Sequence, residues 1–426
     1  MSGLAAYLAQ KGNLVSGSDA SGAAFDFLIK NGVAPRLGLS SKNIPDGVDV
    51  FVYTHAISPN EPEFKAALDS GARLIERSEL LGEIILKDFK NSVAVAGVHG
   101  KTTTTSMVAE VLGILRPTVF IGGHMKPSGL NALIGDELVV VAEACEYRES
   151  FLNIRANIGV ILNIEADHPD FYKDLEHMQS SFAKFALNLP KDGALIINSS
   201  CEKIETHCPV ISFGKNGDFS AFNITQTENE AKFDIKYKEK LFCQANIAAS
   251  GEYNIQNALA AAAVGYALGL EAKEIARGLE NWTGVARRFE FIGKYGDIPV
   301  YDDYAHHPTE IKACLSRLEH KNIVACFQSH TYSRTLALLD EFAKALSICR
   351  RVIIAPIFAA REKIDDPKSV ALKLTDALKK IGVQADFAET FDDAHKLAKQ
   401  ILLPNDVFIS VGAGDVYKVA RTLAEI

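Results

Sequence analysis

The sequence predicts an α/β protein of three domains, and three observations support this fold class. The chain has 426 residues, more than one hydrophobic core usually serves, and apolar β-branched runs repeatedly alternate with helical patterns. Apolar residues make up 48% and charged residues 23%, a composition typical of a folded globular protein. One apolar run ends in a glycine-bounded turn that opens a helix. Together these features favour parallel sheets with helices on their faces.

The first predicted domain covers residues 1–90 and has a Rossmann-like pattern. Extended runs and helical patterns alternate along it, at 2–10, 13–16, 23–31, 48–54, 61–71 and 78–89. A dinucleotide-type fold opens with a strand and a Gly-rich turn before its first helix, but this chain starts inside that helix. We therefore expect a domain whose first strand is missing. Three explanations stay open: a wrongly assigned start codon, a truncation, or a domain that truly lacks this strand. Asp19 stands where such folds place a carboxylate for a ribose, although a turn or capping role fits it equally.

The other two predicted domains are a central P-loop ATPase-like domain, 91–288, and a C-terminal Rossmann-like domain, 289–426. In the central domain we expect strands at 137–142 and 158–163, a small antiparallel excursion at 219–245 and an Ala-rich helix at 257–268. In the C-terminal domain we expect strands at 298–301, 322–327, 351–355 and 406–411, with helices between them.

The most informative stretch follows the apolar run 93–96. It is Gly97-Val98-His99-Gly100-Lys101-Thr102-Thr103. Glycines let backbone N–H groups approach phosphate oxygens, a helix N-terminus adds positive potential, and the hydroxyl after the lysine can hold Mg²⁺. The two glycines enclose two residues, whereas the usual P-loop has four before its Gly-Lys pair. The alternative is an ordinary strand-to-helix turn; the combination of features favours a site for ATP or GTP.

Acidic residues follow two further strands of the central domain. Glu143 follows the run 139–142, and Glu165-Ala166-Asp167-His168 follow the run 158–163. Because parallel strands deliver functional groups at their carboxyl ends, a carboxylate and a histidine there could hold Mg²⁺ beside a nucleotide. The alternative interpretation is a solvated acidic loop.

Polar residues also follow two strands of the C-terminal domain. One group is 302–308, which includes Asp303 and the pair His306-His307, and the other is 328–335, which includes His330 and Arg334. Adjacent histidines diverge and no third ligand is evident, so hydrogen bonding to a ribose or a substrate is favoured over zinc. Arginine suits a bidentate grip on a carboxylate, although capping and a surface ion pair remain open.

The net charge and the cysteine spacing limit the classes of binding partner and the cell compartment that we expect. The formal net charge of −8 argues against nucleic acid and anionic membranes as partners. No stretch approaches the roughly 18 consecutive apolar residues of a membrane-spanning helix. The seven cysteines form no C-x-x-C pair, a pattern typical of reduced thiols in a cytoplasmic enzyme.

These motifs resemble a known family over essentially the whole chain. Its most specific carriers, besides the phosphate loop, are 163–168 (Asn-Ile-Glu-Ala-Asp-His), 251–258 (Gly-Glu-Tyr-Asn-Ile-Gln-Asn-Ala), 287–289 (Arg-Arg-Phe), 302–310 (Asp-Asp-Tyr-Ala-His-His-Pro-Thr-Glu), 327–335 and 410–415. The chain resembles the Mur ligases. The elements His-His-Pro-Thr-Glu and His-x-x-Ser-Arg-Thr point to the alanine-adding branch.

The resemblance implies an ATP-dependent, amide-bond-forming ligase of peptidoglycan synthesis with Mg²⁺. Its three domains would hold, in chain order, a UDP-sugar, ATP and an amino acid, and the last would close over the nucleotide. The substrates it implies are UDP-N-acetylmuramate, L-alanine and ATP, and the reaction passes through an acyl phosphate. Two alternatives stay open: a recycling ligase that attaches a whole peptide to the same UDP-sugar, and a nucleotide-binding protein without ligase activity.

The resemblance also implies roles for single residues. In the central domain Lys101 contacts the β/γ-phosphates, Thr102 and Glu143 ligate Mg²⁺, and His168 serves a second metal. The remaining roles are these: Asn254 and Asn257 beside the adenine; Arg287 or Arg288 and Asp303 at the ribose and phosphates; His306, His330 and Arg334 toward the amino acid and the reacting carboxylate; Asn131 at the muramate; Asp19, His55, Ala56, Ile57 and Ser58 at the UDP. Cys145-Glu146 stands where the family commonly has Asp-Glu, so only Glu143 and Glu146 carry over there.

Overall fold

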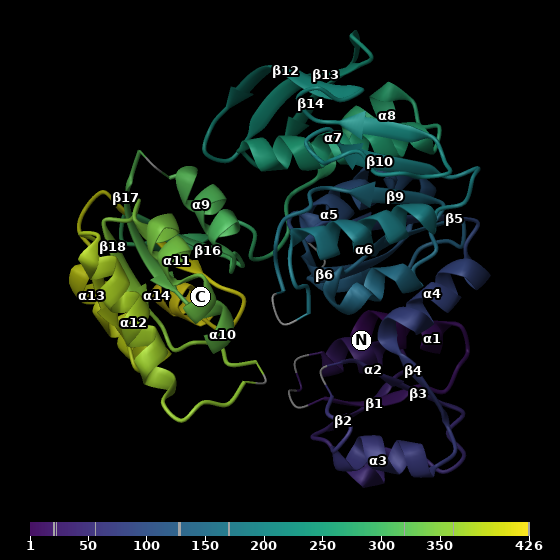
Figure 1. Cartoon of the computed structure of the whole chain (residues 1–426), viewed down its shortest axis with the longest axis horizontal. Coiled ribbons are helices and arrows are strands. Elements are labelled where there is room, and N and C mark those ends of the chain that lie inside the picture. Colours follow the sequence, from purple (N-terminus) through teal and green to yellow (C-terminus); the bar gives the residue numbers. More distant parts are fainter. Residues whose placement is uncertain are drawn as a thin grey trace. The chain divides into compact units, whose positions relative to one another are not determined.

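A computed structural model describes residues 1–19, 22, 24–55, 57–126, 129–168, 171–318, 320–360 and 362–424 (Figure 1). Its α/β architecture of large, mostly parallel sheets confirms the predicted fold class. The chain forms two compact units, 1–224 with 232–247 and 255–283, and 225–231 with 248–254 and 284–426. Among the residues described, no helix combines the length and apolarity needed to cross a bilayer.

The N-terminal region of the first unit holds two pairs of parallel strands, β1 with β2 and β3 with β4. Its elements are α1 (Ser2–Gln10), β1 (Ser16–Asp19), α2 (Phe25–Lys30), β2 (Ala34–Leu37), η1 (Ser41–Asn43), β3 (Val50–Tyr53), α3 (Pro62–Asp69), β4 (Arg73–Glu76) and α4 (Arg77–Asp88). The sequence did not predict β2 and β4, because neither contains a continuous apolar run. The first strand begins at Ser16, not Asn13, since its register is set by pairing with β2.

Helices α1 and α4 pack into the core of the central region. Leu4, Tyr7, Leu81 and Ile85 are buried in one cluster with residues of the central strands. The Tyr7 hydroxyl donates to Asp88 Oδ2 at 2.8 Å. Burying these large side chains favours the packed arrangement by roughly 1.5–3 kcal/mol each. The two helices are therefore anchored to the central sheet by its own core.

The central sheet has ten strands in the order β14-β13-β12-β11-β10-β9-β5-β8-β6-β7. They are β5 (Asn91–Ala96), β6 (Thr118–Met125), β7 (Leu130–Leu133), β8 (Val139–Glu143), β9 (Ile158–Ile161), β10 (Ala194–Asn198), β11 (Val210–Phe213), β12 (Phe219–Gln226), β13 (Ala231–Tyr237) and β14 (Lys240–Ile247). The helical elements are α5 (Lys101–Val111), η2 (Gly113–Leu115), η3 (Tyr147–Asn153), α6 (Leu175–Leu187), α7 (Glu252–Ala267) and α8 (Ala272–Asn281). The expected excursion at 219–245 forms β12–β14, which extend this same sheet.

The second unit is built on a six-stranded sheet in the order β15-β16-β20-β17-β18-β19. Its strands are β15 (Glu290–Tyr295), β16 (Ile298–Asp303), β17 (Asn322–Phe327), β18 (Arg351–Ile354), β19 (Gln384–Phe387) and β20 (Asp406–Val411). Its helices are α9 (Pro308–Ser316), α10 (Tyr332–Ala337), α11 (Leu339–Leu346), α12 (Pro367–Lys380), α13 (Phe391–Ile401) and α14 (Tyr417–Leu423). All strand pairs are parallel except β15 with β16, so the carboxyl ends of β16, β20 and β17 meet at one edge.

Candidate functional site

The phosphate loop leaves the carboxyl end of β5, in the middle of the central sheet. Gly97 has φ 141° and Gly100 has φ 84°, backbone conformations that other residues rarely adopt. A Cβ added to Gly97 would lie 2.9 Å from Leu162 Cβ, so this position also lacks room for a side chain. Helix α5 then runs from Lys101 to Val111, and the short η2 follows it.

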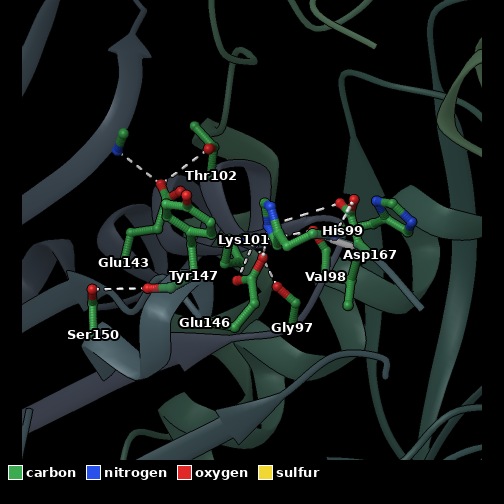
Figure 2. A network of polar contacts seen from close by, with 12 residues as sticks. Gly97, Val98, His99, Lys101, Thr102, Glu143, Glu146, Tyr147, Ser150 and Asp167 are labelled. Atoms are coloured by element: carbon green, nitrogen blue, oxygen red, sulfur yellow. Dashed lines mark hydrogen bonds and ion pairs between the residues drawn. The ribbon is translucent and has the colours of Figure 1, made fainter. Parts of the chain in front are cut away.

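Lys101 is folded back over the loop that precedes it. Its Nζ donates to the carbonyl oxygens of Gly97 at 2.6 Å and Val98 at 3.0 Å, and it pairs with Glu146 Oε2 at 2.8 Å (Figure 2). Burial lowers the pKa of the ammonium, but the facing carboxylate outweighs burial and the net pKa is raised. Lys101 is therefore a charged, ordered cation at the mouth of the loop.

Thr102 and Glu143 meet because β5 and β8 are neighbouring parallel strands, with Val95 opposite Glu143. The Thr102 hydroxyl donates to Glu143 Oε2 at 2.9 Å, and the Gly122 N–H donates to the same oxygen at 2.7 Å (Figure 2). A hydroxyl and a carboxylate are hard oxygen donors that fit Mg²⁺. In the described chain no three His, Cys, Asp or Glu side chains form a metal cage. Phosphate and water oxygens would have to complete such a site, as is usual for nucleotide-bound Mg²⁺.

His168 lies in a second group, with Glu146. Its Nε2 is 3.0 Å from Glu146 Oε1, and its ring centroid is 4.9 Å from that of Tyr147. The backbone of His168 has φ 53°, a left-handed conformation that non-glycine residues seldom adopt. Burial raises the pKa of Glu146, whereas Lys101 and His168 lower it, and the net pKa lies below its usual value.

Two residues without a predicted role shape this site. Asn163 clamps the loop: its Oδ1 accepts from the His99 N–H at 2.8 Å and its Nδ2 donates to the His99 carbonyl at 2.9 Å. Glu146, 1% exposed, joins Lys101 to His168. Both residues follow apolar strand runs, and this position was the sequence signal that could have indicated a functional role. Their partners could not be predicted, because they depend on how β8, β5 and β9 lie side by side.

The two predicted adenine-side asparagines lie on the first turns of α7. Asn257 is buried beside the loop, and a Cβ added to Gly100 would lie 2.8 Å from its Oδ1. Asn254 Nδ2 donates to the Ser250 carbonyl at 2.8 Å. Thr103, the last residue of the predicted loop, is buried in the first turn of α5. The roles of these three residues stay predictions.

In the second unit, the residues after β16 and β17 come together. The ring centroids of His306 and His330 are 5.6 Å apart, and His330 stacks on Phe358 at 5.5 Å. Arg334 is 6% exposed on α10, the helix that follows His330. This places three of the residues expected near the amino acid at one edge of the sheet.

Arg287, Arg288 and Asp303 belong to the same unit, near the start of its segment 284–426. Arg287 and Asp303 make hydrogen bonds there. Arg287 Nε donates to Asp302 Oδ2 at 2.9 Å, and its Nη2 donates to the Gly412 carbonyl at 2.6 Å. The Asp303 carboxylate accepts from the N–H groups of Phe289 and Ala305, each at 2.7 Å. Burial raises the pKa of Asp303, and the charge of Arg288 opposes that rise. Arg287 and Asp303 thus have structural partners in addition to their predicted ribose and phosphate roles.

The predicted substrate contacts lie at strand ends of the N-terminal region. Asp19 ends β1, and exposed residues His55 and Ser58, with half-buried Ile57, follow β3; Ala56 falls outside the described residues. Asn131 is on β7, where its side chain hydrogen-bonds with the Ser2 hydroxyl. A cavity of about 230 Å³ opens there. It is lined by Met1, Gly3, Leu4, Arg77, Phe120, Ile121, Gly122 and Asn131.

The fold and the loop have the form of a nucleotide-dependent α/β enzyme, with a Gly-Lys-Thr turn between a parallel strand and a helix. The chain belongs to the Mur ligase family. Three family models match it: the Mur ligase family, catalytic domain, at 1–88; the Mur ligase middle domain, at 95–265; and the Mur ligase, glutamate ligase domain, at 287–414.

Individual relatives agree with this family. The UDP-N-acetylmuramate--L-alanine ligase of Lachnospira eligens is 40% identical, covering 99% of this chain and 95% of that protein. The protein of the same name in Clostridium kluyveri is 41% identical, covering 99% and 94%. The crystal structure of UDP-N-acetylmuramate-alanine ligase MurC from Thermotoga maritima superposes with a TM-score of 0.84 at 30% identity, covering 100% of this chain and 96% of the other.

Proposed function

We propose that this chain is an ATP-dependent ligase that joins L-alanine to the lactyl carboxylate of UDP-N-acetylmuramate in peptidoglycan precursor synthesis. Relatives with this name match 99% of the chain at 40–41% identity. The observation that carries the proposal is local: the loop after β5 brings Lys101, Thr102 and Glu143 together at one strand edge. A reaction supplied with ATP and a nucleotide sugar belongs in the cytoplasm.

The chemistry explains why such a loop is needed. A carboxylate does not react with an amine near neutral pH because its oxygen is a poor leaving group. Phosphorylation of the carboxylate by ATP gives an acyl phosphate, and attack by the α-amine of L-alanine then releases phosphate. In such a transfer most of the catalysis comes from positioning and from neutralising charge on the moving phosphoryl group.

Residues of this chain can supply both contributions. Lys101 and the N–H groups at the start of α5 would bind phosphate oxygens. Thr102 and Glu143 would hold Mg²⁺, which would neutralise phosphate charge. Asn257 would contact the adenine, and His330 with Arg334 the carboxylate of the amino acid.

A phosphate-release assay tests this proposal. It contains ATP, Mg²⁺ and UDP-N-acetylmuramate, with L-alanine, glycine, L-serine or an alanine-headed tripeptide as the acceptor. We expect phosphate and ADP in equal amounts, with the highest kcat/KM for L-alanine. Preference for the tripeptide would instead assign a peptide-recycling ligase. Nucleotide binding without turnover on any acceptor would assign a nucleotide-binding protein without ligase activity.

A further inference from the structure

Glu146 is a buried carboxylate that the proposed reaction leaves unused. It lies between the two cationic or potentially cationic groups of the site, with Oε2 at 2.8 Å from Lys101 Nζ and Oε1 at 3.0 Å from His168 Nε2. Figure 2 shows its carboxylate directed at Lys101. Only 2% of the Glu146 side chain and 12% of the Lys101 side chain are exposed, so water screens this pair weakly.

Three oxygen atoms surround the Lys101 ammonium. Its Nζ donates to the carbonyls of Gly97 and Val98 and forms an ion pair with Glu146 Oε2 at 2.8 Å. A phosphate oxygen that binds Lys101 must therefore approach an ammonium that is already neutralised by Glu146. Glu146 is the charged one of these three partners. A nucleotide therefore competes with Glu146 for Lys101.

Glu146 itself is held in place. Its backbone carbonyl accepts from the buried Tyr172 hydroxyl at 2.5 Å. The next residues, Arg148 and Glu149, have φ 53° and 55°, and Glu149 Oε1 accepts from Ser181 at 2.6 Å and Lys184 at 2.8 Å. Consecutive left-handed residues persist only where surrounding contacts fix them. These contacts fix the Glu146 backbone, so its carboxylate can stay beside His168 when Lys101 moves.

We propose that Glu146 is a positioning residue. It pairs with Lys101 until a phosphate oxygen binds the Lys101 ammonium, and its carboxylate then orients His168. This inference rests on the proposed function, since it assigns the phosphate to ATP. In this arrangement the filling of the loop by a nucleotide is coupled to the placement of His168, on the neighbouring strand end. Loss of the Glu146 charge should therefore have opposite effects on nucleotide binding and on turnover.

The variant Glu146→Gln tests the competition, because the amide keeps the shape and removes the charge. We expect the Kd for ADP, measured by calorimetry with EDTA present, to fall about tenfold, because the nucleotide no longer has to displace the ion pair between Glu146 and Lys101. We expect kcat to fall between about tenfold and a hundredfold, as for other residues that orient a metal or catalytic ligand. Damage to the fold would weaken binding and turnover together.

Two comparisons separate this inference from its rivals. In a Lys101→Met background, Glu146→Gln should change the Kd for ADP by less than about twofold. Tightening that persists there would mean plain charge repulsion and would overturn the competition. Glu149→Gln makes the same chemical change on the same segment, and an equal tightening in that variant would also overturn it. A wild-type protein that binds no ADP would sink the proposed function, whereas ADP binding without tightening in Glu146→Gln would sink this inference alone.

A crystal structure of the wild-type protein with ADP gives a test that does not depend on the variant folding. We expect the Lys101 Nζ to Glu146 separation to exceed about 4 Å, the limit of an ion pair. The Glu146 to His168 contact should remain near its present 3.0 Å. A Lys101 that contacts phosphate while still paired with Glu146 would contradict the exchange.

Discussion

Replacing Gly97 by alanine perturbs the phosphate loop at the point where the backbone has least freedom. Its φ of 141° is a conformation that is essentially confined to glycine and costs other residues about 1–3 kcal/mol. The new Cβ would lie 2.9 Å from Leu162 Cβ and 3.3 Å from the backbone nitrogens of Leu162 and Asn163. Overpacking against a strand of the core costs about 1–3 kcal/mol more.

We therefore expect Gly97→Ala to destabilise the first unit by about 3 kcal/mol or more, which lowers its Tm by about 6 °C or more. Because the loop must shift to admit the methyl group, we expect ADP affinity to fall about a hundredfold. Differential scanning fluorimetry and ADP titration measure the two effects. Gly113→Ala is the control, since nothing lies within 4 Å of its Cβ. A Gly97→Ala protein with wild-type Tm and ADP affinity would refute the strained-loop reasoning.

Two further predictions concern the metal ligands and the second unit. Thr102→Val removes the hydroxyl bonded to Glu143, so the Mg²⁺ concentration for half-maximal activity should rise by at least about tenfold; Thr105→Val, whose hydroxyl has no hydrogen-bond partner among the described residues, should leave it unchanged. Arg287→Ala should destabilise the second unit by about 3 kcal/mol in urea unfolding, because Asp302, 1% exposed, loses its cation. Burial already raises the pKa of Asp302 in the folded chain, so protonation favours the folded state and the loss should be smaller at pH 5 than at pH 8. An Mg²⁺ dependence unaltered in Thr102→Val, or a loss in Arg287→Ala that grows at low pH, would contradict these accounts.

The parts of the fold that could be predicted are those with long apolar runs. The strands β5, β8, β9, β17 and β20 follow such runs, because a strand buried on both faces needs apolar side chains throughout. The strands β2 and β4 have no such pattern: β2 contains Pro35 and Arg36, and β4 begins with Arg73. They form because tertiary pairing supplies their hydrogen bonds, which local sequence does not reveal.

The candidate site divides in the same way. The adjacency of Thr102 and Glu143 could be expected, since functional groups gather at the carboxyl ends of neighbouring parallel strands. The central position of Glu146 could not, because an acid in a loop rich in acids is usually solvated, and its burial between Lys101 and His168 depends on tertiary packing. Likewise the pairing of Arg287 with Asp302 joins segments whose contact depends on the register of β15 and β16.

The central claim is that Lys101 grips the phosphates whose transfer activates the acceptor carboxylate. The most direct measurement is ADP release by Lys101→Ala in the presence of ATP, UDP-N-acetylmuramate and L-alanine, after circular dichroism has shown that the variant folds. We predict that ADP release falls to the rate seen without enzyme. Turnover at the wild-type rate would contradict the assignment of this loop as the site of phosphate binding.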